Sequence, residues 1–481
     1  MATLRSLLLL FFLFATVPGF SQEPTKLMSL KEAIFLALRY NPDVQIEEIQ
    51  RVVDKFNLRV AQNEFELRYA LTGSIMQSAT RFSGNSSSSR SSTFTPELSL
   101  NGKYGTRYRL RMNNPITQSS GAPGTYNPGI DLEINQPLIR GFGKEVTLAP
   151  LYDATDREII TQLQFKDILM RTVANIITDY RAIIQSQNNV ETSLLALKSY
   201  QQTKEMVEAQ IKAGRKAPSD VLQAESNYAN QLVTLQNTTN QVLNNKLNLL
   251  NEIGLIPSTH FLVPNDVDDI ELEVPKLEKC YTTALEHNIA YQRSLIDLRV
   301  AERTLYVAQD NTRISLDMAL RASTGNSSGT SPNSGLESLT NKKNTNLSVA
   351  LTLDVPIDNF SLKQQLLDAK IALEQQQINL AAQKRELRTT IKNDIIDVSY
   401  KAEQIKLAKK ALELQKNTQQ ALTARLRHGV VSTFEVTQTQ QDLNRSRESL
   451  ISSKIEYLNA LTKLYLDMGV LLEKWQITLI Y

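Results

Sequence analysis

The 481-residue sequence predicts a mixed α and β membrane protein made of two internal structural repeats. Three observations predict this class. Short motifs occur twice in the same order, strand-like segments have one apolar and one strongly polar face, and helical segments run for roughly 55 to 65 residues. An internal repeat this long indicates two copies of one structural unit.

The duplication is visible in motifs and in their spacing. The pattern Ala-Leu-x-x-Asn at 37–41 returns at 284–288. Each copy also has a proline where its strands give way to a helix, Pro137 in the first and Pro356 in the second. The offset between the copies falls from 247 residues at the first motif to 219 at the prolines. The first copy therefore holds 28 additional residues between these points.

Long helical segments follow each proline. In the first copy a helix is predicted from about 151 to 212 and a return helix over 219–252. In the second copy the corresponding helices are predicted over 362–427 and 433–468. Helices this long and rich in Gln, Asn, Ser and Thr must pack laterally against others. A tip glycine stands between the helices of each pair, and a helix-ending glycine follows it after 40 residues: Gly214 and Gly254, then Gly429 and Gly469.

The first residues have the pattern of an export signal. Arg5 precedes an apolar run at 7–17, and small residues follow up to Ser21. This is typical of a secretory signal peptide cleaved near Ser21, and the run is too short to span a membrane. After it, Ser29 and Glu32 form a predicted capping box at the start of the first helix.

Composition excludes several classes of function. The formal charge of +3 gives nucleic-acid binding no electrostatic basis. Cys280 is the single cysteine and is predicted to be a packed core thiol on an apolar helix face. Three scattered histidines have no metal-ligand spacing, and no catalytic motif is present. We therefore expect no catalytic residue, cofactor or metal.

Alternating segments occupy the middle of each copy. In the first copy four strands are predicted within 66–137, separated by polar loops, the first of them at 85–89. In the second copy two strands are predicted within 313–356, on either side of a Ser-, Gly- and Asn-rich loop at 322–345. The 28 additional residues of the first copy match one extra hairpin at about 94–112.

The predicted strands have two different faces. Arg107, Arg109 and Arg111 alternate with apolar residues, as do Asp131 and Glu133 on another strand. Dense, opposite charges on one face suit a hydrated pore lining with cross-strand pairs. A soluble sheet with an ordinary charged face is the alternative. The side chains predicted to face lipid are Tyr69, Leu71, Tyr108, Leu110, Ile130 and Leu132.

Six strands are too few for a barrel with a useful lumen, because side chains already fill small eight-stranded barrels. The sequence therefore predicts a β-barrel shared among subunits. Closed cyclic symmetry is the expected arrangement.

The ordered motifs resemble the TolC-like outer membrane factors, the outer membrane efflux protein family. The resemblance runs from Leu30 to about Met468. It implies that three protomers share one outer-membrane β-barrel, continued by a long periplasmic α-helical barrel. It also implies a periplasmic adaptor and an inner-membrane pump as partners, and passive conduction of substrate through the lumen without catalysis. Members usually have four strands per protomer, so the extra hairpin either widens the barrel or folds outside it.

The resemblance implies functional residues at the helical tips. A periplasmic gate is expected at Glu435, just past the second tip, with Asp220 as its counterpart in the first copy. Gln438 stands at the second acidic position of that ring, and Val431 stands where some members have a basic gate partner. The alternative role for the two acids is compensation of a helix dipole. The residues expected at the adaptor-contact tips are Lys212, Gly214, Arg215, Lys216, Arg425, His428 and Gly429.

The main functional alternative is an exported structural coiled-coil or surface protein without channel activity, which would show sustained heptads. Drug efflux, protein secretion and metal export all fit a lumen lined by Asn, Gln, Ser and Thr. The predicted organisation is a signal at 1–21, a first repeat at 22–254, a linker at 255–275, a second repeat at 276–469 and a tail at 470–481.

Overall fold

The computed structural model describes residues 26–82, 85–265, 272–325, 328–333, 337, 339, 344–428 and 430–477. The predicted signal at 1–21, Gly429 and part of the predicted linker lie outside the described residues. None of the helices in these ranges is both long and apolar enough to cross a membrane.

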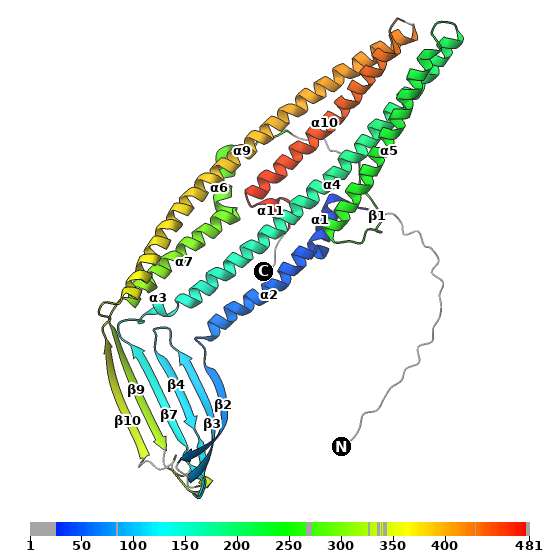
Figure 1. The fold of residues 1–481 in the computed structure, drawn as a ribbon. Helices are drawn as coiled ribbons and strands as arrows, with labels where there is room; N and C mark the ends of the chain where they lie inside the picture. The colour runs from blue at the N-terminus through cyan, green and yellow to red at the C-terminus, as the bar shows by residue number, and fades with distance from the viewer. Residues whose placement is uncertain are drawn as a thin grey trace, which may run out of the picture. The chain divides into compact units, whose positions relative to one another are not determined.

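The described residues fall into two compact units, and Figure 1 labels their elements. The hairpin unit consists of the described parts of Met1–Ala37, Ile176–Ile270 and Ala408–Ile455. The sheet unit consists of those of Leu38–Asn175, Glu271–Leu407 and Glu456–Tyr481.

Two pairs of shorter helices have matching starts. The helices α1 (Leu30–Tyr40) and α2 (Pro42–Asn63) meet at Asn41, whose Oδ1 accepts hydrogen bonds from two backbone N–H groups at the start of α2. The helices α6 (Leu277–His287) and α7 (Ile289–Asn311) meet at Asn288, whose Oδ1 accepts from the Tyr291 N–H at 2.9 Å. An asparagine cap thus starts the second helix of each pair.

The predicted capping box of α1 is confirmed. The backbone N–H of Ser29 donates to a carboxylate oxygen of Glu32 at 3.0 Å, and the Glu32 N–H donates to the Ser29 hydroxyl at 3.3 Å. This reciprocal pair satisfies two helix-start donors.

The long helices are α4 (Ala149–Lys212), α5 (Ser219–Ile253), α9 (Phe360–Arg427) and α10 (Thr433–Asp467). They contain 64, 35, 68 and 35 residues. Short helices α3 (Lys144–Thr147) and α11 (Leu471–Lys474) flank this set.

Both helix-ending glycines have left-handed backbone conformations. Gly254 has φ 87° and Gly469 has φ 79°, a region in which side chains are disfavoured. At Gly469 an added Cβ would lie 2.2 Å from the carbonyl oxygen of His287. Glycine is therefore required there by the backbone conformation and by the close approach of α6.

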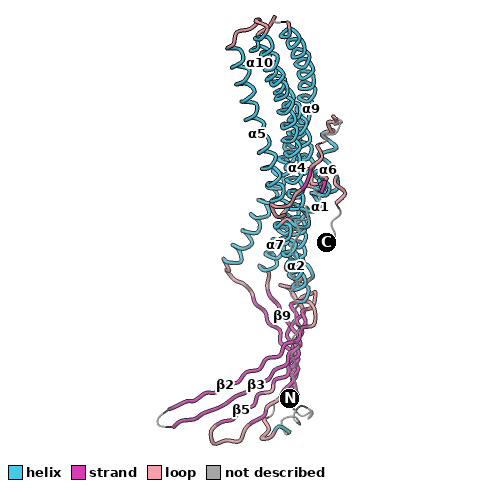
Figure 2. Tube along the Cα trace, turned by 90° about the vertical axis from the view of Figure 1, so that its right-hand side faces the viewer, coloured by secondary structure: helices cyan, strands magenta, loops and turns pink. Residues whose placement is uncertain are grey.

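The sheet unit contains one antiparallel sheet, drawn in Figures 1 and 2. Six strands lie side by side in the order β2-β3-β4-β7-β9-β10. Two short strands, β5 and β6, continue the sheet beyond β4 along the same edge of β3. The bounds are β2 Arg68–Phe82, β3 Asn85–Asn101, β4 Arg107–Asn113, β5 Pro115–Ser119, β6 Thr125–Tyr126, β7 Gly129–Pro137, β9 Ser315–Gly325 and β10 Thr345–Asp354. In the hairpin unit, β1 (Lys26–Leu27) pairs in parallel with β8 (Phe261–Leu262).

The loop predicted at 85–89 is wrong, because these residues are the first part of β3 and pair with the end of β2. Strand pairing uses backbone groups, and serine hydroxyls add to it across the strands. The Ser78 and Ser89 hydroxyl oxygens are 2.7 Å apart. The second polar loop, predicted between Met112 and Gly124, likewise contains β5. As a result the end of β2 and the start of β3 form a polar ribbon, which extends beyond the neighbouring strands (Figure 2).

Candidate functional site

The sheet register places the five predicted lumen charges on one face. Arg109 pairs in register with Glu133, and Arg111 with Asp131. Arg107 lies two residues from Arg109 and shares its face. The register thus gives β4 and β7 a common charged face.

Ion pairs join these charges across four strands. An oxygen of Glu97 lies 3.5 Å from Nε of Arg109, and Nη1 of Arg109 lies 3.4 Å from Glu133. On the other side of Glu133, Arg321 approaches it at 3.0 Å. Glu97 and Arg321 were not among the predicted site residues, because only the strand register brings them to this ladder.

The opposite face is apolar and exposed. In one row Tyr69 pairs with Leu98, Leu98 with Leu110, and Leu110 with Leu132. Tyr69 is 76% exposed. A contiguous apolar face of this size in a soluble chain marks an interaction surface or a lipid contact. The exposed apolar side chains of this face also include Leu71, Tyr108, Leu347, Val349, Leu351 and Leu353.

The two strand-to-helix prolines lie in different surroundings. Pro137 is buried at the end of β7, where it lies opposite Asp317 of β9 in the strand register. Beyond it, the Gly141 N–H donates to a carboxylate oxygen of Asp310 at 2.6 Å. Pro356 is half-buried, two residues past the end of β10.

The predicted tip residues that the structure describes lie at the ends of the helical hairpins, within the hairpin unit. At the first tip Gly214 has φ 71° and its N–H donates to the Ile211 carbonyl at 2.9 Å. A side-chain amide of Gln210 donates to the Leu426 carbonyl at 2.9 Å, which brings the two tips together. Lys216 contacts the hydroxyl of Thr433. The exposed members of the predicted set are Lys212, Gly214, Arg215, Arg425 and His428.

The predicted gate residue Glu435 lies in the first turn of α10 and pairs with the preceding Ser432. Its N–H donates to the Ser432 hydroxyl at 3.2 Å, and that hydroxyl donates to its carboxylate at 3.2 Å. Glu435 and Gln438 are exposed, whereas Asp220, in the first turn of α5, is half-buried. The capping geometry holds the Glu435 carboxylate beside the positive helix end while leaving it open to solvent.

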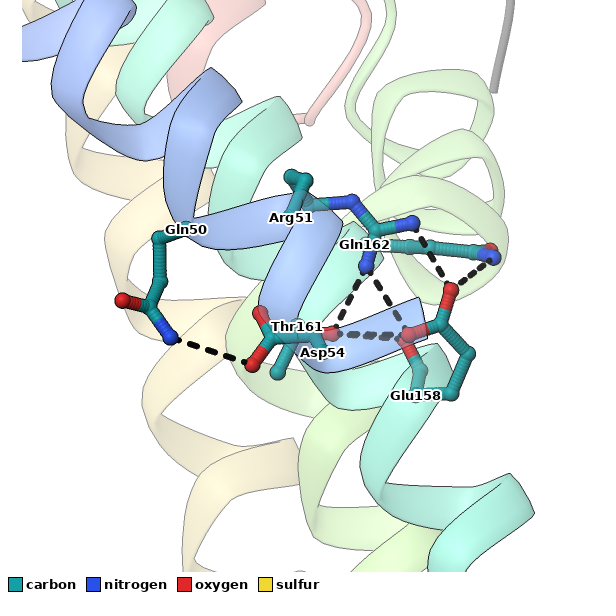
Figure 3. A network of polar contacts seen from close by, with 6 residues as sticks. All are labelled: Gln50, Arg51, Asp54, Glu158, Thr161 and Gln162. Atoms are coloured by element: carbon teal, nitrogen blue, oxygen red, sulfur yellow. Dashed lines mark hydrogen bonds and ion pairs between the residues drawn. The ribbon is translucent and has the colours of Figure 1, made fainter. Parts of the chain in front are cut away.

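A buried ion pair joins α2 to α4 in the sheet unit (Figure 3). The guanidinium of Arg51 donates to both carboxylate oxygens of Glu158, at 2.8 and 3.1 Å. It also donates to the Thr161 hydroxyl at 2.8 Å, and Gln162 donates to Glu158 at 3.2 Å. The two charged side chains are 7% and 8% exposed. Arg51 and Glu158 are separated by 107 positions in the sequence, so no local pattern could have revealed the pair.

A second buried charge cluster lies on α9 and α10 of the sheet unit. Asp394 is 5% exposed and contacts the ammonium group of Lys463, which also lies 3.1 Å from Asp467. Burial raises the pKa of Asp394 to about 6.

This pKa predicts a pH-dependent stability. The folded chain keeps the Asp394 proton up to about pH 6, whereas an unfolded aspartate loses it near pH 4. The folded state therefore binds more protons in this interval, and the free energy of unfolding should fall as pH rises through it. Asp394→Asn should flatten this dependence in thermal unfolding followed by circular dichroism. Asp397→Asn, at an exposed position of the same helix, is the control. An unchanged pH profile in Asp394→Asn would contradict the assignment.

Cys280 is buried, as predicted, and burial raises the pKa of its thiol. Among the residues that the structure describes, no group of three or more His, Cys, Asp or Glu side chains is placed to hold a metal ion.

The described chain thus combines a sheet that has one apolar and one charged face with long helical hairpins. The model of the outer membrane efflux protein family matches residues 281–470. The sequence resemblance to the TolC-like outer membrane factors is thus confirmed. A comparison with curated proteins gives no match.

Solved structures with this fold cover nearly the whole chain. The outer-membrane channel OprN is similar with a TM-score of 0.69 and 13% identity, over 92% of this chain and 89% of that one. The outer membrane protein VceC from Vibrio cholerae has a TM-score of 0.67 and 16% identity, over 92% and 96%. The Campylobacter jejuni CmeC outer membrane channel has a TM-score of 0.64 and 13% identity, over 94% and 91%.

Proposed function

We propose that the chain forms an outer-membrane exit duct, which passively conducts substrates from a periplasmic adaptor and an inner-membrane pump to the exterior. The observation that carries the proposal is the two-faced sheet. Its apolar face suits lipid and its charged face suits a watery lumen. Efflux and type I secretion both fit this duct, and neither requires catalysis by the chain.

The proposed assembly is a homotrimer that shares one β-barrel in the outer membrane, with the helices in the periplasm. Within the described residues, β2 and β10 are each paired along one side only. Unpaired strand edges are templates for pairing with another chain. Since the two free edges lie at opposite sides of the sheet, β2 of one copy can pair with β10 of the next.

The helices next to these edges support the same contact. On α2, exposed apolar residues recur at spacings of three and four, as in a coiled-coil seam. They are Ile46, Ile49, Val53, Phe56 and Val60, and each is 49% to 69% exposed. The helix α2 leads into β2, and α9 follows β10.

The early part of α9 carries a matching apolar set. Leu367, Ile371 and Ile378 are 56%, 44% and 61% exposed. One side of the chain thus offers the edge strand β2 and the apolar face of α2, and the other side offers β10 and the apolar face of α9. These two surfaces differ, so the contact between copies would be head-to-tail. Such head-to-tail contacts form a ring when the rotation closes.

We further propose that the two halves of the chain are structural repeats. The asparagine caps, the 35-residue return helices and the positive-φ glycines at their ends support this reading. The exposed tip residues are the proposed adaptor contacts, because they lie at the ends of the helical hairpins.

Membrane fractionation tests the proposal against the alternative of an exported structural coiled-coil protein. The duct predicts a heat-modifiable trimer in the outer-membrane pellet that conducts ions in a planar bilayer. A structural protein would give neither the membrane pellet nor the conductance.

Glu435→Gln is expected to weaken cation block of this conductance. Three copies of the carboxylate near the axis of a trimer would attract cations, and the amide removes their charge. The glutamine side-chain oxygen can accept the same hydrogen bond from the Ser432 hydroxyl, so the start of helix α10 should stay intact. Glu435→Ala removes both functions and is the companion variant. Unchanged current and unchanged cation block in both variants would contradict a gate at this position.

A further inference from the structure

We infer that the extra hairpin, β3 and β4 with the turn between them, belongs to the pore wall, so that each subunit contributes six strands to it. The inference rests on the proposed function and deepens it, because it fixes the wall of the duct. Three copies of the six-stranded sheet give an eighteen-stranded barrel.

The register is the first argument. The hairpin lies inside the sheet, with β3 paired to β2 and β4 paired to β7. Its Leu98 and Leu110 continue the apolar row between Tyr69 and Leu132. Neither strand of the hairpin is at an edge, so its removal would break the sheet between β2 and β7.

The charged face is the second argument. On that face the hairpin supplies Glu97 and Arg109 to the ion-pair ladder that continues to Glu133 and Arg321. The hairpin repeats, in register, both the apolar and the charged pattern of the neighbouring strands. This match is expected of strands that face the same lipid and the same lumen.

The turn of the hairpin is the third argument. Gly105 has φ 95°, and an added Cβ would lie 2.5 Å from the Gly141 carbonyl oxygen and 2.8 Å from the Pro137 ring. Next to it, the rings of Tyr104 and Phe142 have centroids 6.5 Å apart, and the ammonium group of Lys144 lies 5.3 Å from the Tyr104 centroid. The turn is therefore fixed against the junction between β7 and the helices.

The consequence is a wider duct in the membrane. Barrel diameter grows roughly linearly with strand number. An eighteen-stranded wall would be about 1.5 times as wide as a wall with four strands from each of three subunits.

Spin-label accessibility tests the inference in trimers reconstituted into lipid vesicles. In a Cys280→Ser background, single cysteines replace Leu98 and Leu110 on the hairpin, and Leu132 and Leu320 on β7 and β9. Two polar-face positions, Ser99 and Ser323, serve as controls. Each label is tested for collision with oxygen, which enters lipid, and with a water-soluble nickel chelate.

The six-stranded wall predicts that labels at Leu98 and Leu110 match those at Leu132 and Leu320, with several-fold higher oxygen than nickel accessibility. Labels at the two serines should show the reverse order. Nickel-accessible labels at Leu98 and Leu110, together with oxygen-accessible labels at Leu132 and Leu320, would overturn the inference and leave the duct standing. Nickel access at all four leucines would overturn the membrane placement itself.

Discussion

Arg51→Met is expected to lower the free energy of unfolding by about 3–5 kcal/mol, because it leaves the buried Glu158 carboxylate without its cation. Burial opposes ionisation of Glu158, but the hydrogen bonds from Arg51 and Gln162 outweigh it and hold its pKa below the ordinary value. Methionine fills a similar volume but supplies no donor. Temperature-dependent loss of helical circular dichroism in detergent measures the effect.

Two further variants separate the buried charge from other causes. Arg59→Met removes the exposed ion pair with Glu66 on the same stretch of chain, where the side chains are 60% and 44% exposed. It should cost no more than about 1 kcal/mol. Arg51→Met combined with Glu158→Leu should recover much of the lost stability, since no charge then stays buried. Equal losses in Arg51→Met and Arg59→Met would refute the role of burial.

Leu132→Arg is expected to destabilise the proposed membrane-inserted trimer by roughly 2–4 kcal/mol, the cost of an arginine on the lipid face near mid-bilayer. Leu132 lies in the centre of the sheet, in register between Leu110 and Ala322. The yield of heat-modifiable trimer and the temperature at which it dissociates measure the cost.

The matched control places the same side chain on the other face. Ser323 pairs in register with Asp131, so Ser323→Arg adds a cation opposite a carboxylate. It should leave trimer stability within about 1 kcal/mol of the parent. If Leu132→Arg were tolerated as well as Ser323→Arg, the apolar face would not face lipid.

The helices were predictable because their ends depend on local signals. The predicted return helix over 219–252 is α5, Ser219–Ile253, since Gly254 stops it in a conformation that glycine favours. The predicted long helix over 362–427 is α9, Phe360–Arg427. The start of β3 was missed, because a run of serines has the composition of a loop and its pairing depends on a partner strand.

The residues of the candidate site also differ in whether a local sequence signal could reveal them. Strand alternation is local, so Arg109 and Glu133 could be assigned to one face from the sequence. The ion pair between Arg51 and Glu158 depends on the packing of α2 against α4 and has no local signal. Ser432 and Glu435 have the Ser-x-x-Glu spacing of a capping signal, which was not among the sequence predictions. A capping role does not by itself decide whether the acid also acts as a gate.

The polar ribbon formed by the end of β2 and the start of β3 determines what the proposed duct presents at the cell surface. The last pair of β7 and β9 is Gly129 with Gly325, whereas β2 and β3 continue to the pair of Phe82 with Asn85. In the proposed orientation this extension points away from the periplasm, beyond the lipid. Each subunit of the proposed assembly would therefore present a serine-rich extension to the outside of the cell.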